Sequence, residues 1–429
     1  MARKMKDSGI EWIGEIPEEW SKNKVIRLFD IIGSGTTPKN ITSDFPVVNW
    51  IQSGDITGSF MPTCKNVISA NLLSQYSALK VYPAPFIIIA MYGASVGNAS
   101  ISLIDGCVNQ ACCVLSSPSC NLHYAFYVIK SAQSYLVRKA VGGGQPNISQ
   151  ETIKQLWLPL PPLSTQDIIV RNLDATCSKI DDLLSSVHAS IEEYKKLKQA
   201  VITQAVTKGV RGEREMKDSG VEWIGKIPRE FDPVQLKFFC KLITDGTHFS
   251  PTTVENGWPY ITAGDVHGIG LDYNSAKRIS EEDFQLLVTQ GCQPLKGDVL
   301  LVKDGATTGR VGFVDSDTPC VILSSVAMLR PADNTDGHYL MYLLASDFLQ
   351  KQILVSMAGS AMPRTTLTKL TKYIGLLPPL HEQKEIANYL DAKCAEIDGL
   401  IAKKEQLVKE LEGYKKSLIY EVVTGKREV

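Results

Sequence analysis

The sequence predicts an α+β protein in which two mixed α/β heads, related as a pseudo-twofold tandem repeat, are joined by two long helices that form an antiparallel coiled coil. Three observations lead to this fold class. The chain contains an internal duplication, each copy ends in a long proline-free segment with coiled-coil spacing, and the remainder holds short apolar runs bounded by turn residues. At 429 residues, the chain is long enough for two or three domains.

The duplication is visible at two anchors. Met5–Pro17 and Met216–Pro228 are identical at 11 of 13 positions, and the Leu-Pro-Pro-Leu run that begins at Leu160 recurs at Leu377. From the second anchor onward the copies match without a gap at an offset of 217 residues, whereas between the anchors the offset changes along the chain. Each copy is therefore a variable head followed by a well-matched tail. The predicted order is a head over 1–157, a helical region over 158–212, a head over 213–374 and a helical region over 375–429.

Each tail is predicted to be one long helix. In the first tail, Pro161 and Pro162 end the preceding segment, and Ser164 with Asp167 resembles a capping box. Apolar residues then recur at coiled-coil spacing. In the first tail they are Ile180, Leu183, Val187, Tyr194, Leu197 and Val201, and in the second Ile397, Leu400, Leu407, Leu411, Tyr414 and Leu418.

The apolar residues of each tail form a stripe along one side of its predicted helix. Two packings of these helices are compatible with this stripe. Each helix can pack on its own head, or the two helices can cover each other. The length of the stripe favours mutual pairing, because a small head cannot cover a helix about 60 Å long at a rise of 1.5 Å per residue. Ser190 and Lys404 interrupt the stripes, and we hypothesise that they fix the register.

The heads show the pattern of mixed α/β structure. The apolar runs Phe86–Met91 and Val299–Val302 are predicted as buried strands, as are 113–115 and 326–329, and helices are predicted over 123–135 and 338–354. Three polar loops recur at matching places in the two heads. We call them the first loop (33–40 and 244–251), the second loop (92–97 and 304–309) and the third loop (142–147 and 359–364).

Composition limits the function classes. The chain has 45 basic and 46 acidic residues, a net charge of −1, which excludes a protein that coats nucleic acid or membrane through bulk charge. No apolar stretch is long enough to span a membrane and no secretory signal is recognised, so we expect a cytoplasmic protein. The ten cysteines form no CxxC pair, and we expect reduced, mostly buried thiols rather than a metal site.

Enzyme signatures are incomplete in this sequence. There is no GxxxxGK[ST] loop, and the glycine runs do not form GxGxxG after a strand. Leucine, not Asn or Asp, precedes Pro161 and Pro378, so these dipeptides lack the residue that an amino-methyltransferase uses on its target base. The six histidines form no HExxH pattern. We therefore expect no catalytic residue and no metal site in this chain.

The polar loops allow two interpretations. Thr, Ser, Asn, Gln, Lys and Arg side chains can donate to and accept from base edges, but the same residues also form ordinary turns. The loops differ between the two copies, whereas the tails stay similar. This suggests that the two heads bind two different ligands.

At the level of the whole chain, the sequence resembles the specificity subunit of type I restriction-modification systems. The resemblance is carried by DSGIEWIGEIPEEW and DSGVEWIGKIPREF at the start of each copy, and by the P-P-L-x-x-Q segments with the following I-D-x-L helices. It implies that each head is a target-recognition domain for one half of a bipartite sequence in double-stranded DNA, and that the coiled coil separates the heads.

The resemblance also implies the partners. Two methyltransferase (modification) subunits are expected to dock on the chain and methylate adenine N6, and restriction subunits with translocase and nuclease activity then join. S-adenosylmethionine, ATP and Mg²⁺ are expected on those partners, and no cofactor is expected in this chain.

The resemblance assigns base reading to the three loops. In the first head the implied DNA-binding residues are Thr36, Thr37, Lys39, Tyr92, Ser95, Gln145 and Asn147, and in the second they are Thr247, His248, Lys303, Thr307, Arg310, Arg364 and Thr365. Because net charge is near zero, we hypothesise that the methyltransferase partners supply much of the phosphate neutralisation. The alternative to DNA recognition is a coiled-coil adaptor whose heads bind protein or carbohydrate ligands.

Overall fold

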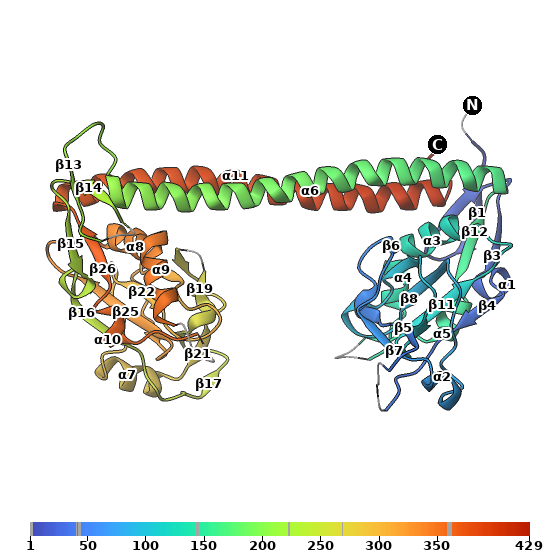
Figure 1. Cartoon of the computed structure of the whole chain (residues 1–429), viewed down its shortest axis with the longest axis horizontal. Coiled ribbons are helices and arrows are strands. Elements are labelled where there is room, and N and C mark those ends of the chain that lie inside the picture. The colour runs from blue at the N-terminus through green and yellow to red at the C-terminus, as the bar shows by residue number, and fades with distance from the viewer. Residues whose placement is uncertain are drawn as a thin grey trace. The chain divides into compact units, whose positions relative to one another are not determined.

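The computed structural model of the chain describes residues 3–39, 41, 44–142, 146–221, 224–267, 269–357 and 363–429. They form two compact units. Unit 1 comprises residues 1–187 with 406–429, and unit 2 comprises 188–405. Each unit contains one head and parts of both long helices, so the predicted α+β class with two mixed heads and paired helices is confirmed (Figure 1).

The head of unit 1 is built on a five-stranded sheet in the order β4-β11-β8-β9-β6, in which only the β6–β9 pair is parallel. Its strands are β4 (Ile31–Gly33), β6 (Phe60–Met61), β8 (Phe86–Ala90), β9 (Ala99–Ser102) and β11 (Cys112–Ser116). A smaller sheet contains β5 (Val47–Ile51), β7 (Asn66–Ser69) and β10 (Cys107–Val108). Two two-stranded sheets pair β1 (Met5–Ile10) with β2 (Gly14–Pro17), and β3 (Ser21–Lys24) with β12 (Trp157–Leu160). All five residues of β8 are buried, which explains its uninterrupted apolar sequence.

The head of unit 2 repeats this plan. A four-stranded antiparallel sheet runs β16-β25-β22-β23, with β16 (Cys240–Asp245), β22 (Val299–Val302), β23 (Val311–Phe313) and β25 (Val326–Pro331). A second sheet contains β17 (Thr253–Val254), β18 (Trp258–Ile261), β21 (Lys277–Ile279) and β24 (Val321–Ile322). Two-stranded pairs join β13 (Met216–Asp218) to β14 (Lys226–Pro228), β15 (Asp232–Gln235) to β26 (Ile374–Leu377), and β19 (Val266–His267) to β20 (Gly270–Leu271).

The predicted head helices each divide in two. In unit 1, α3 (Leu122–Ser131) and α4 (Gln133–Arg138) meet at Ala132. In unit 2, α8 (Gly337–Ala345) and α9 (Asp347–Ser356) meet at Ser346, whose backbone is extended. An Asn or Asp side chain caps the start of the first helix in each head, which is why these helices begin where they do. The short helices are α1 (Val25–Leu28), α2 (Leu72–Gln75), α5 (Gln150–Lys154), α7 (Glu281–Thr289) and α10 (Leu367–Leu370).

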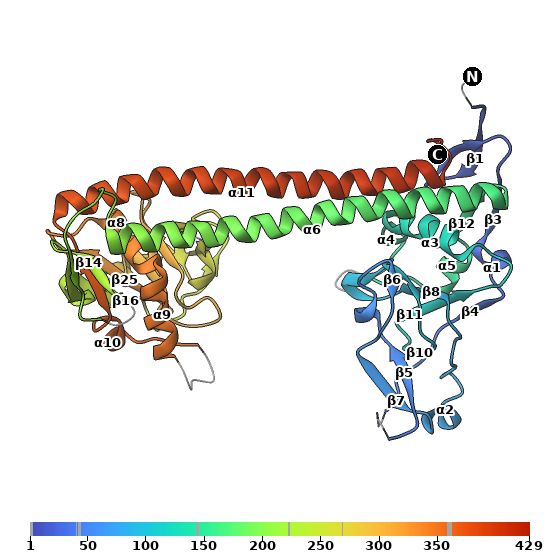
Figure 2. The ribbon, with the colours of Figure 1, turned by 45° about the horizontal axis from the view of Figure 1, so that its top comes forward.

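The two tails form single helices, α6 (Leu163–Lys208, 46 residues) and α11 (Leu380–Val423, 44 residues). They lie side by side in Figures 1 and 2. In unit 1, Lys415 pairs with Asp181, and in unit 2, Lys198 pairs with Asp398. Within each unit, the end of one helix therefore lies against the beginning of the other, as the predicted antiparallel pairing requires.

The buried face of these helices differs in part from the predicted stripe. Ile180, Ile397 and Leu418 are buried as expected, and the residues at 187, 194, 201, 400 and 411 are half-buried. Four predicted seam residues are exposed, and for them the prediction is wrong: Leu183 by 54%, Leu197 by 48%, Leu407 by 41% and Tyr414 by 47%.

The error has a geometric cause. A helix turns by 100° per residue, so a stripe continued by three residues from Ile180 points to Leu183, whereas continuing by four points to Leu184. The structure uses the second path, through Leu173, Cys177 and Ile180, with Leu184 packed at the edge of the core. Of the two polar interruptions, Ser190 is half-buried, and the Lys404 ammonium lies 5.5 Å from the Tyr194 ring centroid.

Each head core is completed by both tails. The core of unit 1 includes Leu173 of α6 together with Ile419 and Val422 of α11. The core of unit 2 includes Leu390 of α11 together with Ile202 and Ala205 of α6, which are the residues at matching positions in the repeat. Each head is thus covered by the beginning of the tail that follows it and by the end of the other tail.

Candidate nucleic-acid interface

The second and third loops are joined in the same way in both heads. In unit 1, a backbone bridge links Tyr92 to Asn147, and the Gly93 amide donates to the Pro146 carbonyl at 2.9 Å. In unit 2, the equivalent bridge links Asp304 to Arg364, and the Gly305 amide donates to the Pro363 carbonyl at 3.0 Å. The shared backbone frame presents different side chains in the two heads.

Glycines make this frame possible. The second loop connects β8 to β9 in unit 1 and β22 to β23 in unit 2, and it turns sharply at both of its ends. Gly93 and Gly97 have φ of 73° and 79°, and Gly305 and Gly309 have φ of 98° and 97°. These are left-handed conformations that glycine adopts without strain, so the duplicated spacing of the glycines preserves the turn while its other residues vary.

The first loop is held against the neighbouring sheet. A Cβ added to Gly35 would lie 1.6 Å from the Val108 carbonyl oxygen, and one added to Gly246 would lie 1.9 Å from the Ile322 carbonyl oxygen. Only glycine permits this approach. In unit 1, the Thr37 hydroxyl further contacts the Gln110 side chain at 2.6 Å, which fixes the tip of the loop.

In unit 2, one ion-pair chain connects all three loops. Lys303 Nζ lies 3.3 Å from Asp245 Oδ2 of the first loop and 3.0 Å from Asp304 Oδ2 of the second. Arg364 Nε of the third loop lies 2.9 Å from Asp304 Oδ1, an ionic contact without hydrogen-bond geometry. Lys303 is 3% exposed, whereas the Arg364 side chain is 60% exposed. The buried lysine balances the two carboxylates, and one of these carboxylates holds the exposed guanidinium.

The predicted DNA-binding residues fall into three groups. Those with exposed side chains are Thr37, Lys39, Tyr92, Asn147, His248, Arg310 and Arg364. Thr36, Ser95 and Thr307 are half-buried, and Gln145 lies outside the described residues. Thr247, Lys303 and Thr365 are buried, at 5%, 3% and 0% exposure.

The three buried residues support the loops from inside. Thr247 accepts from the Phe249 amide at 2.9 Å, and the Thr365 hydroxyl lies 2.7 Å from the Tyr373 hydroxyl. As placed in this structure, these side chains hold the loop backbone and do not face solvent. DNA contact by them would require the loops to move.

Sequence reasoning missed Asp245, Asp304 and Phe249. The two carboxylates each lie beside a cation of the loops, Lys303 for Asp245 and both Lys303 and Arg364 for Asp304. Phe249, which is 52% exposed, adds an aromatic face to the first loop of unit 2. The feature of the sequence that points to Phe249 is its position directly after His248, inside the first loop.

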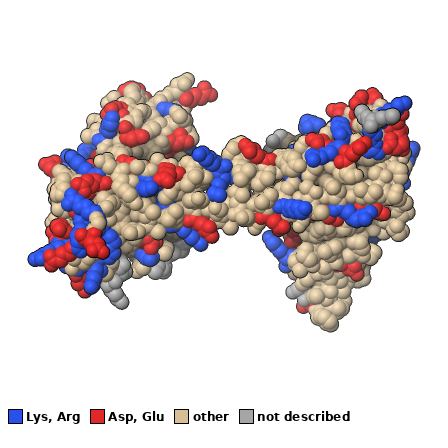
Figure 3. All heavy atoms as spheres, turned by 90° about the horizontal axis from the view of Figure 1, so that it is seen from above, with Lys and Arg blue, Asp and Glu red and all other residues tan. Residues whose placement is uncertain are grey.

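Charge on the surface is mixed. Figure 3 shows Lys and Arg intermingled with Asp and Glu on the face in view, as the net charge of −1 leads one to expect. Within the described ranges, no cluster of three His, Cys, Asp or Glu side chains is arranged to hold a metal ion. The cysteines are free thiols, and burial raises the pKa of Cys107 to about 11 and that of Cys320 to about 12.

Comparison with known proteins identifies relatives for both halves of the chain. The type I restriction modification DNA specificity domain matches residues 17–193 and 228–410. The chain is 28% identical over 314 residues to the type I restriction enzyme MjaVIII specificity subunit of Methanocaldococcus jannaschii, covering 71% of this chain and 69% of that protein. It is 24% identical over 378 residues to the EcoBI specificity subunit of Escherichia coli, covering 84% and 78%.

The fold has a solved counterpart. A chain from a structure described as the basis of complex assembly and conformational transition of the type I R-M system superposes with a TM-score of 0.71, at 17% identity, covering 95% of this chain and 98% of that one. At this identity the likeness concerns the fold.

Proposed function

The chain belongs to the family of type I restriction-modification DNA specificity subunits, and we propose that it reads a bipartite DNA target without catalysing a reaction itself. Each head binds one half-site through its three loops. The observation that carries this proposal is the shared backbone frame of the second and third loops, which presents Tyr92 and Asn147 in one head but Asp304 and Arg364 in the other. Two such readers on one chain suit two different half-sites.

Arg364 is the most specific reader that we propose. Its guanidinium is exposed, and Asp304 fixes one edge of it, which leaves its remaining donors for a base. Arginine most often reads guanine in the major groove through paired contacts with O6 and N7. We therefore assign a guanine contact in the second half-site to Arg364, whereas the uncharged Asn147 at the matching position suits adenine.

Docking of two methyltransferase subunits is supported by repeated exposed apolar side chains on the tails. Leu197 of α6 and Tyr414 of α11 occupy matching positions in the repeat, and they are 48% and 47% exposed. Leu163 and Leu380, at the matching beginnings of the two helices, are 64% and 37% exposed. Exposed apolar groups that recur by duplication suit two copies of one partner.

The methyltransferase subunits would bring S-adenosylmethionine and the chemistry of adenine-N6 methylation, and restriction subunits would bring ATP, Mg²⁺ and cleavage. No helix in the described part of the chain has the length and apolarity needed to cross a membrane. The proposal places the protein in the cytoplasm, together with DNA and these partners.

Methylome sequencing tests the proposal. A host that lacks adenine-N6 methylation is given the chain together with its methyltransferase subunit, and methylated adenines are mapped. We expect one bipartite motif with two different half-sites separated by a fixed spacer. A control that carries the methyltransferase subunit alone is expected to show none.

Two results would contradict the proposal. Methylation by the purified chain alone would show that it is an enzyme. Unchanged methylation with and without the chain, combined with capture of a protein or carbohydrate ligand by the heads, would favour the adaptor function.

A further inference from the structure

A cleft lies at the same place in each unit, where the head meets the paired helices. Its volume is about 300 Å³ in unit 1 and about 450 Å³ in unit 2. The helix residues in the two linings match at the repeat offset of 217 residues. Three such pairs are Asp181 and Asp398, Lys198 and Lys415, and Ile202 and Ile419. The cleft was therefore retained in both copies, although the loops of the heads diverged.

Each cleft borders the second loop of its head. In unit 1, Gln133 lines the cleft and donates to the Asn98 side chain at 2.7 Å, directly after the second loop. In unit 2, Gln350 lines the cleft and donates to the Gly309 carbonyl at 2.8 Å, at the end of that loop. A ligand in either cleft would thus lie near the end of the second loop.

Basic side chains outnumber carboxylates among the described residues of both linings. Lys130, Lys415 and Lys416 face Asp181 and Glu412 in unit 1. The lining of unit 2 holds Lys195, Lys198, Arg310 and Asp398. Lys198 pairs with Asp398 and Lys195 pairs with Glu192, so Arg310 is the excess basic group of this lining. In a chain with a net charge of −1, an excess of one positive charge in each of the two equivalent clefts points to an anionic ligand.

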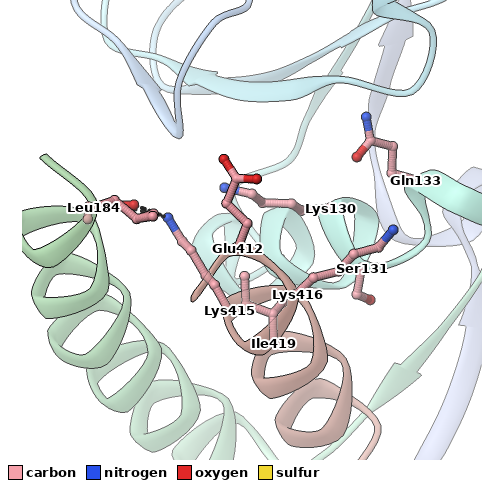
Figure 4. Close-up of a pocket in the computed structure, with 9 residues that line it drawn as sticks. Lys130, Ser131, Gln133, Leu184, Glu412, Lys415, Lys416 and Ile419 are labelled. Carbon is pink, nitrogen blue, oxygen red and sulfur yellow. Dashed lines mark hydrogen bonds and ion pairs between the residues drawn. The ribbon is translucent and has the colours of Figure 1, made fainter. Parts of the chain in front are cut away.

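Two of the three cations in the unit 1 cleft donate to hydroxyl groups, whereas the third, Lys415, is paired with Asp181. Figure 4 shows Lys130 extending from α3 on one side of the cleft, and Lys415 and Lys416 extending from α11. Lys130 donates to the Ser59 hydroxyl at 3.0 Å, and Lys416 donates to the Ser134 hydroxyl at 2.7 Å. Burial lowers the pKa of Lys130, and the neighbouring Lys415 lowers it further. An anion bound next to Lys130 and Lys416 would offset this unfavourable effect on Lys130.

We propose that each cleft binds backbone phosphates of duplex DNA next to the half-site that its head reads. This inference rests on the proposed function and adds to it a sequence-independent contact. Phosphates are the same in every half-site, which explains why the duplicated clefts were kept while the loops changed. It also assigns Arg310 to the backbone, since that residue lines the cleft of unit 2.

Salt dependence of binding tests the proposal. The full chain, with its methyltransferase subunits, is titrated with a duplex that carries the methylated motif and with one of scrambled sequence, at several salt concentrations. Each phosphate contact contributes about 0.9 to the slope of log K against log salt. We expect the double variant Lys130→Gln, Lys416→Gln to lower the magnitude of that slope by about 1 to 2. Binding should weaken by the same factor for both duplexes, and the methylated motif should stay unchanged.

The matched control is Lys179→Gln with Lys409→Gln. These lysines are exposed, lie on α6 and α11 within unit 1, and do not line the cleft. We expect the control to change the slope much less. Assembly with the methyltransferase is measured in parallel by size-exclusion chromatography.

Three outcomes would overturn the phosphate site. The first is a wild-type slope in the cleft variant, and the second is an equal change in the control. The third is loss of methyltransferase assembly without a change of slope, which would identify the ligand as an acidic protein segment. Failure of the proposed function itself looks different, because the wild-type complex would then bind both duplexes equally.

Discussion

Lys415 of α11 donates to both carboxylate oxygens of Asp181 on α6, at 2.5 and 2.7 Å. The same contact occurs in the other unit, where Lys198 donates to both oxygens of Asp398 at 2.8 and 2.6 Å. Each residue of the second pair differs from its counterpart by 217 positions. The duplication therefore copied an interhelical contact, and each copy aligns the two helices within its own unit.

The Asp181–Lys415 pair is expected to contribute alignment more than stability. The Asp181 side chain is 55% exposed, and ion pairs in contact with water contribute about 0.2 to 1 kcal/mol. A double-mutant cycle with Asp181→Asn and Lys415→Met, followed by urea unfolding, should give a coupling free energy below about 1 kcal/mol. A coupling of about 3 kcal/mol, the size expected for a buried pair, would contradict this.

The seam of α6 can be tested by two leucines. Leu173 is fully buried in the core of unit 1, whereas Leu183, ten residues further along the helix, is 54% exposed. Leu173→Ala is expected to lower the free energy of unfolding by about 2 to 5 kcal/mol, because it leaves a cavity. Leu183→Ala serves as the control, and its effect should be about 0.5 kcal/mol or less. An equal loss of unfolding free energy in both variants would support the burial of Leu183 that the sequence predicted.

Arg364→Ala is expected to relax one position of the second half-site. Loss of a paired base contact costs about 1 to 3 kcal/mol of discrimination, and the first half-site should be unaffected. Methylated-motif mapping measures both half-sites at once. Asp304→Asn should relax the same position, because it releases the guanidinium from its ion pair.

The control for that experiment is Arg229→Ala. Arg229 is an exposed arginine of unit 2, and its partner is Glu215 rather than a loop residue. We expect the wild-type motif in this variant. If the methylated motif is unchanged in Arg364→Ala, Arg364 does not read a base.

Stability should fall at alkaline pH because of buried thiols. Burial raises the pKa of Cys320 to about 12 from an ordinary value of 9.0, so the folded state keeps this proton after the unfolded state has lost it. The stabilisation is complete below pH 9 and is lost as the pH rises toward 12, by about 1.4 kcal/mol per pH unit for one thiol.

Urea midpoints at pH 8 and pH 10 provide the measurement. The midpoint of the wild-type chain should fall more between these pH values than that of Cys320→Ala. Other buried thiols contribute equally to both proteins and cancel in the comparison. The same fall in both proteins would mean that Cys320 titrates normally.

The sequence by itself determined the tandem repeat, the beginning of each tail and the position of the loops. These features depend on neighbouring residues. Pro161 and Pro162 end one segment, and α6 starts directly after them at Leu163. The predicted cap is wrong, because Ser164 is the second residue of the helix and does not precede it. The strands at Phe86 and Val299 were likewise predictable, since an unbroken apolar run leaves a buried strand few alternatives.

Only the tertiary structure decided which side of the stripe is buried and which tail covers which head. Leu183 and Leu184 are equally apolar and adjacent, and their exposure depends on a helix more than 200 positions away in the chain. The same holds for Lys303, whose type suits a DNA contact but whose burial between Asp245 and Asp304 follows from the approach of two separate loops. Local periodicity fixes the secondary structure, whereas burial is set by long-range contacts that no short pattern encodes.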